Sequence, residues 1–440
     1  MRSINGYGGY SFFFFIFDIH MTIHFSLMHV AIDQVRFYYV RLEWFLSQTI
    51  PLSLWLQVQT LYPKISWIDR DSNWHMAACH QIWLCHHLPT SIQVTPIRQT
   101  TRQTPNGLRS RFRLFGIAST PTSFFLPQYE IHHLTNQYMF ALNCIFPTCF
   151  PLEGIKQLIK NMSRSCIPNC IPKAHAQVNL LWNIQYSPTL SGWNQCLHQL
   201  ITQMHGRQID KLVIARKKIL HFQHIVDVFD WLTYKPNCFH FVLIFKPNLA
   251  LICLSPERLY LRNHSMLMTE AMAATRPRHA LQDARWAVHL HSHKKDMMEQ
   301  NWVKLDLKTK LMCLGKMLSC RQDAIFQTSY LQHLYMPFQV ELDGHHLMDH
   351  HLIHVIHPTA AICGSPMPQA YLMLQKYERV ARGAYACPMG WIGSHDAHLC
   401  VSIRCAVIDS NKVMIYAGCG VIAASLPQSE WNETENKFVY

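Results

Sequence analysis

Carboxylates recur in the second half of the chain at spacings that suit chemistry. Glu299 follows Asp296 by three residues, and Glu433 follows Glu430 by three, so the side chains of each pair share one face of a helix. Hard oxygen ligands spread over two helices suit Mg²⁺, which keeps several waters and takes one or two carboxylates plus an anionic substrate. An E-x-x-E pair by itself more often marks a solvated helix face, so the spacing leaves both interpretations open.

A lysine and a further carboxylate stand at the ends of apolar segments. Lys211 opens KLVIAR (211–216), a branched run that is typical of a strand. If this strand is central, desolvation of the ammonium favours the neutral amine that a general base needs. A lysine at the mouth of an edge strand is the alternative. Glu257 comes just after another strand-like run and is a further candidate.

A histidine-rich tract suggests a different metal. Residues 345–357 read HHLMDHHLIHVIH, and His346, His350 and His354 share one helical stripe. Imidazole ligands suit zinc or nickel. The chain contains 29 histidines, however, so a solvated or half-buried helix face is the alternative.

The composition favours a packed globular protein without a nucleic-acid partner. The chain has 440 residues, of which 49% are hydrophobic and 15% charged, with a net charge of +13. Lysine and arginine are scattered and no finger-type fingerprint is present, so we expect no nucleic acid, while a small anionic substrate is compatible. The 16 cysteines lack the spacing of a disulfide scaffold, which predicts reduced and mostly buried thiols.

The N-terminal segment is apolar but does not match a membrane anchor. Residues 11–32 include Asp18, His20, His24 and His29, whereas a spanning helix needs roughly 18 or more apolar residues with few charges. A signal peptide would need a basic start and a small-residue cleavage site. We therefore expect a buried strand pair or helix of a soluble domain, and no membrane partner.

The elements that must position the candidate side chains become legible from about residue 190. The predicted helices are 191–206 with Ser191 as N-cap and Gly206 as stop, one long helix over 282–314, and 427–437. The predicted strands are 211–216, 239–245, the start of 248–261, 398–408 and 412–422. Residues 95–123 have loop composition. Mixed elements of this kind predict α+β or α/β layers in one large unit.

Nine segments, taken together, resemble the chorismate-utilising enzymes, and within them the isochorismate synthases of menaquinone and plant type. They occur in family order across about 250 residues, whereas the first 190 residues show no clear match. The segments are KLVIAR (211–216), SPERL (255–259), TEAMAATRPR (269–278), KKDMMEQ (294–300), LQHLY (331–335), HPTAAICGSP (357–366), RGAYACPMGWIG (382–393), SIRCAVID (402–409) and YAGCGVIAASLPQSEWNETENK (416–437).

The resemblance implies a reaction and its acid–base pair. It implies an isomerase that converts chorismate to isochorismate by adding water at ring carbon 2 and losing the hydroxyl at carbon 4. Lys211 matches the lysine that activates the water, and Glu257 matches the acid that protonates the departing hydroxyl. A base and an acid that hold opposite protonation states at one pH fit such an exchange.

The resemblance also implies ligands for metal and substrate. Glu299 and Glu433 match direct Mg²⁺ ligands, and Asp296 and Glu430 match partners that act through water. The implied substrate-binding residues are Thr275, His357, Tyr385, Arg404, Gly418 and Lys437. In this interpretation His357 is the functional residue of the histidine tract, and the preceding histidines are a helix face.

The implied fold is α+β: a large two-layer domain with facing antiparallel β-sheets and helices outside, like that of anthranilate synthase component I. Residues 1–190 would be the divergent N-terminal part of this fold and residues 191–440 the chorismate-binding catalytic part. A monomer is implied, located in the cytoplasm or, in a plant, in the plastid stroma. The product would feed menaquinone, siderophore or salicylate synthesis.

Departures from the family pattern keep two alternatives open. Residues larger than the usual glycine or alanine stand at Ala274, Cys253, Cys387 and Cys419, and Gln300, Ala381 and Leu426 also replace the usual residues. A degenerate relative that binds chorismate without turning it over is therefore one alternative. A salicylate synthase, which shares the lysine and goes on to expel pyruvate, is the other.

Overall fold

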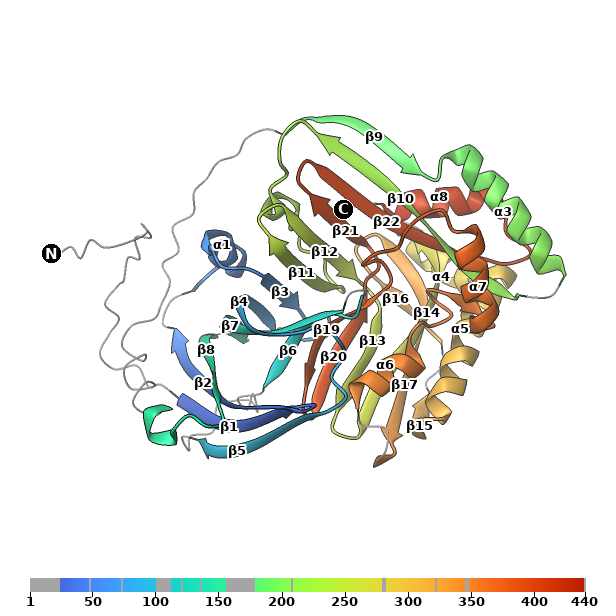
Figure 1. Cartoon of the computed structure of the whole chain (residues 1–440). Coiled ribbons are helices and arrows are strands. Elements are labelled where there is room, and N and C mark those ends of the chain that lie inside the picture. Colours follow the sequence, from blue (N-terminus) through green and yellow to red (C-terminus); the bar gives the residue numbers. More distant parts are fainter. Residues whose placement is uncertain are drawn as a thin grey trace.

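The computed structural model describes residues 24–46, 49–72, 74–99, 112–119, 122–134, 137–155, 179–206, 209–278, 282–320, 323–344 and 348–438. Antiparallel strands dominate this part of the chain, and most helices gather on one side of it (Figure 1). Among the described residues, no helix combines the length and the apolar character needed to cross a membrane.

The strands come first in the chain and then alternate with helices. The strands are β1 (His24–Ile32), β2 (Val35–Leu46), β3 (Lys64–Ile68), β4 (His75–Cys85), β5 (Ile92–Gln99), β6 (Arg113–Ile117), β7 (Ser123–Leu134), β8 (Gln137–Pro147), β9 (Leu181–Ser187), β10 (Lys211–Phe222), β11 (Phe239–Lys246), β12 (Leu249–Ser255), β13 (Arg258–Asn263), β14 (Met266–Pro277), β15 (Gly315–Cys320), β16 (Ala324–Gln327), β17 (Leu331–Leu342), β18 (Gly364–Ser365), β19 (Pro388–Gly393), β20 (Asp396–Val401), β21 (Cys405–Asp409) and β22 (Lys412–Val421). The helices are α1 (Leu52–Val58), α3 (Leu190–His205), α4 (Asp283–Ser292), α5 (Lys294–Met312), α6 (Asp349–Ile356), α7 (Met367–Tyr377) and α8 (Pro427–Lys437), with a 3₁₀ turn at Val228–Trp231.

The described strands form one hydrogen-bonded network that branches at β7. One branch runs through β4, β3, β11, β12, β21, β22 and β10 to β9. The second runs through β6, β19, β20, β13, β14 and β17 to β15 and β16. A third arm joins β8, β2, β1 and β5. All these pairings are antiparallel, and each long branch joins N-terminal strands to strands of the C-terminal part, at β3–β11 in the first branch and at β6–β19 in the second.

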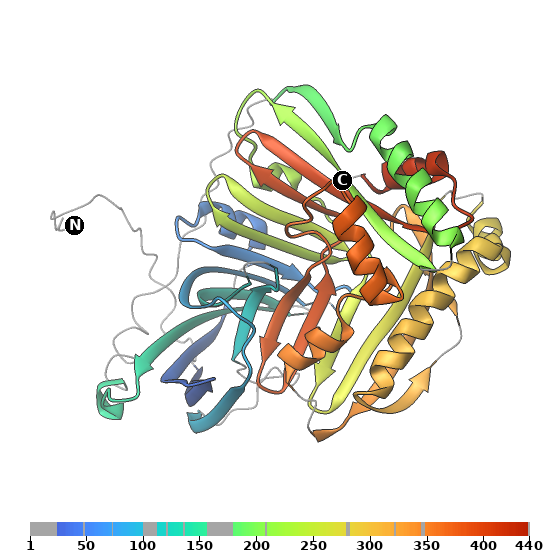
Figure 2. The same cartoon turned by 45° about the vertical axis from the view of Figure 1, so that its right-hand side comes forward.

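The two long branches form the facing sheets, and helices cover their outer sides. Helices α4 and α5 pack on β14 and β17 of one branch, and α7 and α8 pack on β10 and β22 of the other (Figures 1 and 2). The predicted α+β architecture of antiparallel sheets with helices outside is thus confirmed. The added finding is that both sheets belong to one continuous network.

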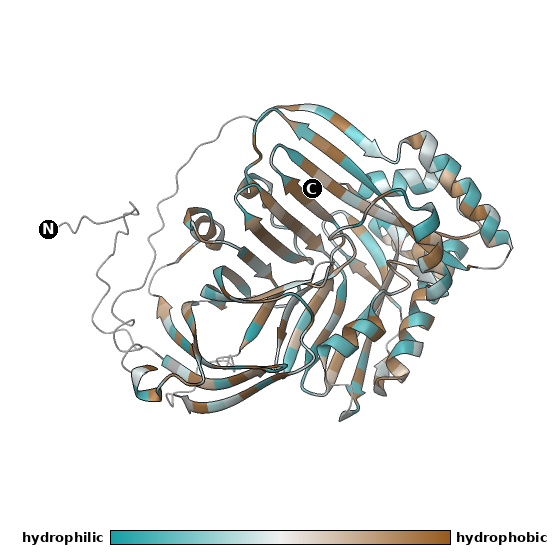
Figure 3. Cartoon of the chain, in the orientation of Figure 1, coloured by the Kyte–Doolittle hydropathy of each residue, from teal (hydrophilic) through white to brown (hydrophobic). Residues whose placement is uncertain are grey.

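The hydrophobic core is shared between the N-terminal and C-terminal strands. Trp67 on β3 stacks on Phe239 of β11 with 5.5 Å between ring centroids, and both are fully buried. Phe115 of β6 joins the same cluster as Met389 of β19. Figure 3 shows hydrophobic residues along the inner strands and mixed hydropathy on the outer helices. Burial of these aromatic residues, about 1.5–3 kcal/mol each for a full side chain, links the two parts of the chain.

Several local predictions need correction. The cap of α3 is Thr189 rather than Ser191, because the Thr189 side chain accepts from the backbone of Gly192. The predicted helix 282–314 is two helices, because the backbone of His293 is extended. The predicted strand 398–408 is likewise two strands.

Other predictions fall partly outside the described residues. The predicted loop 95–123 is wrong where it is described, because residues 95–99 belong to strand β5 and 113–117 form β6, while residues 100–111 lie outside the described part. In the apolar segment 11–32, the described end is strand β1, and residues 11–23 lie outside the described part.

Candidate active site

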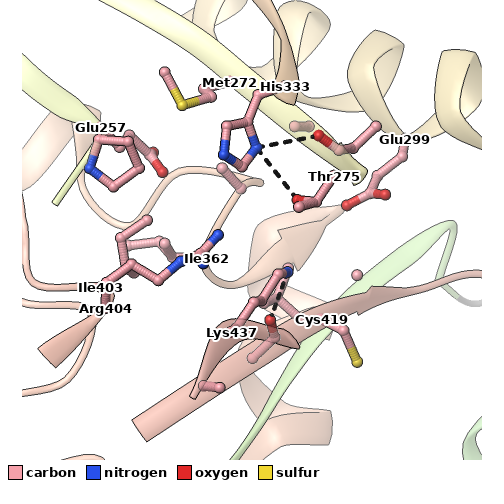
Figure 4. A pocket seen from close by; sticks show the side chains of 18 of the residues that line it. Glu257, Met272, Thr275, Glu299, His333, Ile362, Ile403, Arg404, Cys419 and Lys437 are labelled. Atoms are coloured by element: carbon pink, nitrogen blue, oxygen red, sulfur yellow. Dashed lines mark hydrogen bonds between the residues drawn. The ribbon is translucent and has the colours of Figure 1, made fainter. Parts of the chain in front are cut away.

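A pocket of about 610 Å³, partly open to solvent, lies between the facing sheets. Strands β10, β14, β17 and β22 form its walls, helices α5 and α8 each contribute a charged residue, and loops before β13, before β19 and before β21 close its ends (Figure 4). It contains seven of the predicted site residues: Glu257, Thr275, Glu299, Tyr385, Arg404, Gly418 and Lys437. The tertiary structure thus gathers residues that are up to 180 positions apart.

Lys211 does not itself line the pocket; it lies next to Glu299, which does. Its side chain is fully buried, and Nζ lies 3.3 Å from Oε1 of Glu299 without a hydrogen-bond partner among the described residues. Gly420 on β22 makes this approach possible: a Cβ there would collide with Oε1 of Glu299 and would lie 3.0 Å from Cε of Lys211. The predicted lysine is therefore central in the sheet rather than at an exposed edge, with pairing to β22 and β18.

Glu257 presents a buried carboxyl to the pocket. The turn between β12 and β13 carries it, and the hydroxyl of Ser255 accepts from its backbone N–H at 3.2 Å. The residue is 4% exposed. Burial, followed by the nearby Glu270 carboxylate, raises the pKa of Glu257 to about 8 from its usual 4.5. Glu257 is therefore largely protonated at neutral pH, the state that a general acid needs.

Two of the predicted metal ligands lie behind the pocket wall and are paired with cations. Asp296 on α5 accepts from Nη2 of Arg276 at 2.5 Å, and Glu430 on α8 pairs with Lys295. Burial raises the pKa of both carboxyls despite these cations. Oε2 of Glu430 is buried with no hydrogen-bond partner in the described structure. Unmet hydrogen-bonding capacity of this kind is unusual in a folded protein and calls for an explanation.

The other predicted ligand on α8 is tied to a lysine. Glu433 accepts from Nζ of Lys437 at 2.6 Å, and the same ammonium donates to the backbone carbonyl of Gly418 at 2.9 Å (Figure 4). Burial opposes ionisation here, but Lys437 and Lys295 lower the pKa of Glu433, so it is charged. Lys437 is thereby anchored with its ammonium beside the pocket floor.

The donor set fits a hard divalent cation, although the described side chains do not converge on one point. Four carboxyls from α5 and α8, one with a free buried oxygen, are the oxygen donors that Mg²⁺ prefers: Asp296, Glu299, Glu430 and Glu433. No three histidine, cysteine or acidic side chains in the described ranges are close enough together to hold a metal. The cations Arg276, Lys211, Lys295 and Lys437 engage the carboxyls instead.

A second group of polar residues lines the opposite part of the pocket. The Tyr385 ring stacks on Tyr416 at 5.8 Å between centroids, and a Cβ at Gly418 would lie 2.5 Å from its hydroxyl. Arg404 has a φ of 53°, a conformation that costs a non-glycine residue about 1–3 kcal/mol. A strained arginine at a pocket and a glycine that admits a tyrosine hydroxyl suit recognition of a carboxylate.

Strand β14, at the edge of the pocket, carries one of the residues that depart from the family pattern. A bulge falls between Ala273 and Thr275, and Ala274 within it has a φ of 53°. This left-handed conformation favours glycine, which is the residue usual at this position in the family pattern. Ala274 departs from that pattern. The bulge directs Thr275 to the pocket, where its hydroxyl lies 3.3 Å from Nδ1 of His333.

His333 on β17 is a pocket residue that the sequence analysis did not select. Its ring is buried, burial lowers its pKa well below the usual value, and Nε2 has no hydrogen-bond partner in the described structure. Figure 4 shows it between Met272 and Thr275. The LQHLY segment contains it, but residues 331–334 are all buried, so His333 resembles an ordinary core position.

His357 does not line the pocket. Its Nε2 donates to the carbonyl of Ala386 at 2.8 Å, next to Tyr385. Burial lowers the pKa of His357 to about 4, so the ring is neutral. The histidine therefore supports the loop that carries Tyr385.

The rest of the histidine tract has a structural role where it is described. Asp349 accepts from Arg262 and Tyr260 in the core, His350 is half-buried and His354 is exposed. His346 lies outside the described residues. The buried side of α6 is formed by Leu352, Ile353 and Ile356, with Val355 only partly buried.

A pocket lined by a protonated acid, an arginine and a lysine is typical of an enzyme site for a small anion. Comparison with known proteins narrows this class. Residues 118–440 match the family model described as chorismate binding enzyme, and the chain belongs to that family.

Two relatives with similar sequences share one description. The chain is 29% identical over 255 residues to isochorismate synthase MenF of Haemophilus influenzae, covering 56% of this chain and 58% of that protein. It is 30% identical over 262 residues to isochorismate synthase MenF of Escherichia coli, covering 58% and 60%. The alignments thus span less than two thirds of these relatives' own lengths.

The structure of MenF, the menaquinone-specific isochorismate synthase from Escherichia coli, has the same fold. It superposes with a TM-score of 0.76 at 24% identity and covers 93% of this chain and 94% of that one. The likeness extends through the N-terminal strands, where sequence analysis found no match.

Proposed function

We propose that the protein is an isochorismate synthase, which converts chorismate to isochorismate. One observation carries the proposal: Glu257, protonated near neutral pH, and Glu299 with its neighbour Lys211 lie at opposite ends of one pocket in the view of Figure 4. An acid and a base on either side of a ring are what an exchange of one hydroxyl for another across a diene requires.

The residues can be assigned to a balanced exchange. Lys211 takes a proton from a water that attacks ring carbon 2. Glu257 gives its proton to the hydroxyl on carbon 4, which leaves as water, so one water enters and one departs. Lys437, Tyr385 and Arg404 bind the carboxylates of the dianion. Base activation of this kind contributes roughly 10²–10⁴-fold to the rate.

We propose Mg²⁺ as the cofactor, with Glu299 and Glu433 as ligands and Asp296 and Glu430 as partners through water. The buried oxygen of Glu430 that has no hydrogen-bond partner in the described structure supports this assignment, because carboxylate oxygens are the donors that Mg²⁺ prefers. A bound Mg²⁺ would neutralise the ring carboxylate of the substrate. Lys295 and Arg276 must then release their carboxylates, or share them with the ion.

Product analysis tests the activity. Incubation with chorismate and Mg²⁺, followed by chromatography, is expected to give isochorismate. Salicylate and pyruvate would instead indicate a salicylate synthase. Chorismate binding without product from folded protein would indicate a non-catalytic relative, the alternative that the strained Ala274 favours.

Thermal unfolding tests the metal independently of turnover. Binding to the folded state raises the free energy of unfolding by RT ln(1 + [Mg²⁺]/Kd), so the midpoint should rise with Mg²⁺. Glu430→Gln should weaken that rise, while Glu130→Gln, in a buried cluster outside the pocket, should preserve it. An equal rise in both variants would contradict the assignment.

We also propose that the protein acts as a monomer, in the cytoplasm or, if it comes from a plant, in the plastid stroma. Light scattering of the purified chain tests the oligomeric state.

A further inference from the structure

The turn that carries Glu257 is held from the N-terminal part of the chain. Arg70, just after β3, donates through Nη1 to the carbonyl of Pro256 and at 2.6 Å to Oε1 of Glu270. The same Oε1 accepts from the backbone N–H of Arg258 at 2.8 Å. The peptide groups on both sides of Glu257 are thus fixed by one ion pair.

This ion pair has the geometry of a rigid clamp. Nη2 of Arg70 donates to Oε2 of Glu270 at 2.9 Å, so the contact is bidentate. The guanidinium lies 4.8 Å from the ring centroids of both Phe239 and Phe326. Its side chain is 2% exposed and that of Glu270 is completely buried. A lysine could neither fork to the carboxylate nor stack between two rings in this way.

A second set of contacts ties the neighbouring residue to the same loop. The guanidinium of Arg258 pairs with Asp71, and its Nε lies 3.2 Å from His398. His398 in turn contacts Asp69 at 3.1 Å. Residues 69–71 of the loop after β3 therefore contact the turn on both sides of Glu257 directly or through His398.

The clamp also sets the electric field at Glu257. Burial opposes ionisation of Glu270, but Arg70 lowers its pKa, so Glu270 is charged. That fixed negative charge is the largest influence on Glu257 after burial, and it acts to keep the Glu257 proton in place. Arg70 acts in the opposite direction on Glu257, but it is what keeps Glu270 ionised.

We propose that Arg70 and Glu270 are positioning residues for Glu257: Arg70 fixes the turn, and the Glu270 charge holds the acid in its protonated form. The inference rests on the proposed function for the role of Glu257 as an acid. It assigns to the N-terminal part of the chain a direct contribution to the active site, through a loop whose residues do not line the pocket.

Glu270→Gln separates charge from position. Glutamine keeps an oxygen that can accept from Arg70 and Arg258, but it removes the negative charge. The pH at which kcat declines on the alkaline side should fall by about one unit or more, with little change in KM. An alkaline limb that stays in place in an active variant would overturn the role of the charge.

Arg70→Met and Arg70→Lys test position. Both should lower kcat roughly 10- to 100-fold, because small misplacements of a catalytic group are costly, with KM nearly unchanged. Restoration of kcat by lysine would overturn the need for a fork. The matched control is the buried pair Arg41–Glu130, joined at 2.9 Å outside the pocket. Glu130→Gln should lower thermal stability and leave kcat and its pH profile unchanged; an equal shift of the profile would overturn the inference.

An infrared titration keeps this test independent of turnover. The carbonyl stretch of the protonated Glu257 carboxyl is assigned by its loss in Glu257→Gln and followed with pH. Its midpoint, expected near 8 in the unaltered protein, should fall in Glu270→Gln. An unchanged midpoint overturns the inference even if isochorismate is formed, whereas a shifted midpoint without isochorismate overturns only the proposed function.

Discussion

Two clusters of buried charge among the described residues differ in how completely their atoms are paired. The Arg41 cluster, in the N-terminal part, comprises Tyr39, Arg41, Glu43, Glu130, His132 and Asn143. The pocket cluster comprises Lys211, Glu257, Glu299, His333 and Glu430. Both are almost excluded from solvent.

In the Arg41 cluster the partners are complete. Arg41 donates to Glu43 at 2.6 Å and to Glu130 and Asn143 at 2.9 Å, and His132 lies 2.7 Å from Glu130. None of its buried polar side-chain atoms lacks a hydrogen-bond partner among the described residues. Burial opposes ionisation of Glu130, but Arg41 lowers the pKa of its carboxyl to about 2, which is typical of a structural ion pair.

In the pocket cluster the partners are incomplete. Nζ of Lys211, Nε2 of His333 and Oε2 of Glu430 have no hydrogen-bond partner in the described structure. Burial raises the pKa of Glu257 and of Glu430. In the pocket cluster a bound ligand would use this free bonding capacity, whereas the Arg41 cluster has none to offer.

The largest expected effect comes from removal of residues 1–190, which contain the Arg41 cluster. We propose that residues 1–190 and 191–440 are two parts of one cooperative fold. Residues 191–440 alone should fail to fold, because they would expose the edge of β11 that pairs with β3 and the edge of β19 that pairs with β6. Circular dichroism and solubility measure this, and a cooperative thermal transition in the fragment would contradict it.

Loss of the pocket lysine should affect rate but not fold. Lys211→Ala should lower kcat roughly 10²–10⁴-fold, since a general base is removed. The thermal midpoint should fall less than in Arg41→Ala, because Nζ of Lys211 loses only its 3.3 Å contact with Glu299 and no hydrogen bond. Chorismate binding by calorimetry serves as the control for an intact pocket. Retained turnover would mean that another group activates the water.

Loss of the central arginine of the Arg41 cluster should affect fold but not rate. Arg41→Ala leaves Glu43 and Glu130 without their cation, at a cost of about 3–5 kcal/mol in the free energy of unfolding. Denaturant unfolding measures this cost. At temperatures where the variant is folded, kcat should be unchanged, and a reduced kcat there would show that the two clusters are coupled.

The pH dependence should separate the two carboxyls. The pKa of Glu257 is raised from 4.5 to about 8, so its acid form is present below pH 8 and is lost as the pH rises through that value. We expect kcat to fall about tenfold per pH unit above pH 8. Glu130, with a pKa of about 2, does not titrate in this range. A flat alkaline limb would contradict the role of Glu257.

The smallest test relieves strain at the pocket. Ala274→Gly should raise the free energy of unfolding by about 0.5–1 kcal/mol, because φ at this position is 53°. The pocket wall would also lose a methyl group, so KM for chorismate should change, while kcat should not decrease. A destabilised variant would show that the Cβ packs more favourably than the strain costs.

The sequence predicted the C-terminal elements better than the N-terminal ones. The strand that begins at Lys211 and the helix that carries Glu430 and Glu433 follow the predicted pattern. The break at His293 had no signal, since neither proline nor glycine interrupts the helical pattern there. In the N-terminal part, strands such as β7 are buried on both faces, so they lack the alternation by which strands are recognised.

The residues of the candidate site also fall into those that the sequence predicted and those that it could not predict. The resemblance selected residues whose types repeat in local motifs, and most of them line the pocket. It could not select Arg70, which stands alone in a segment without a motif and acts on Pro256, 186 residues further along the chain. Nor could it show that His357 supports a loop from outside the pocket.

The sequence by itself determined the identity and local spacing of the chemical groups: two carboxylates per turn on each of two helices, a lysine at the start of a strand, an acid after another strand. The tertiary structure decided which of these groups are charged and which are free. Protonation of Glu257 depends on burial and on a Glu270 charge that Arg70 maintains. Desolvation and the distance between charges are set by long-range packing, which no local pattern records.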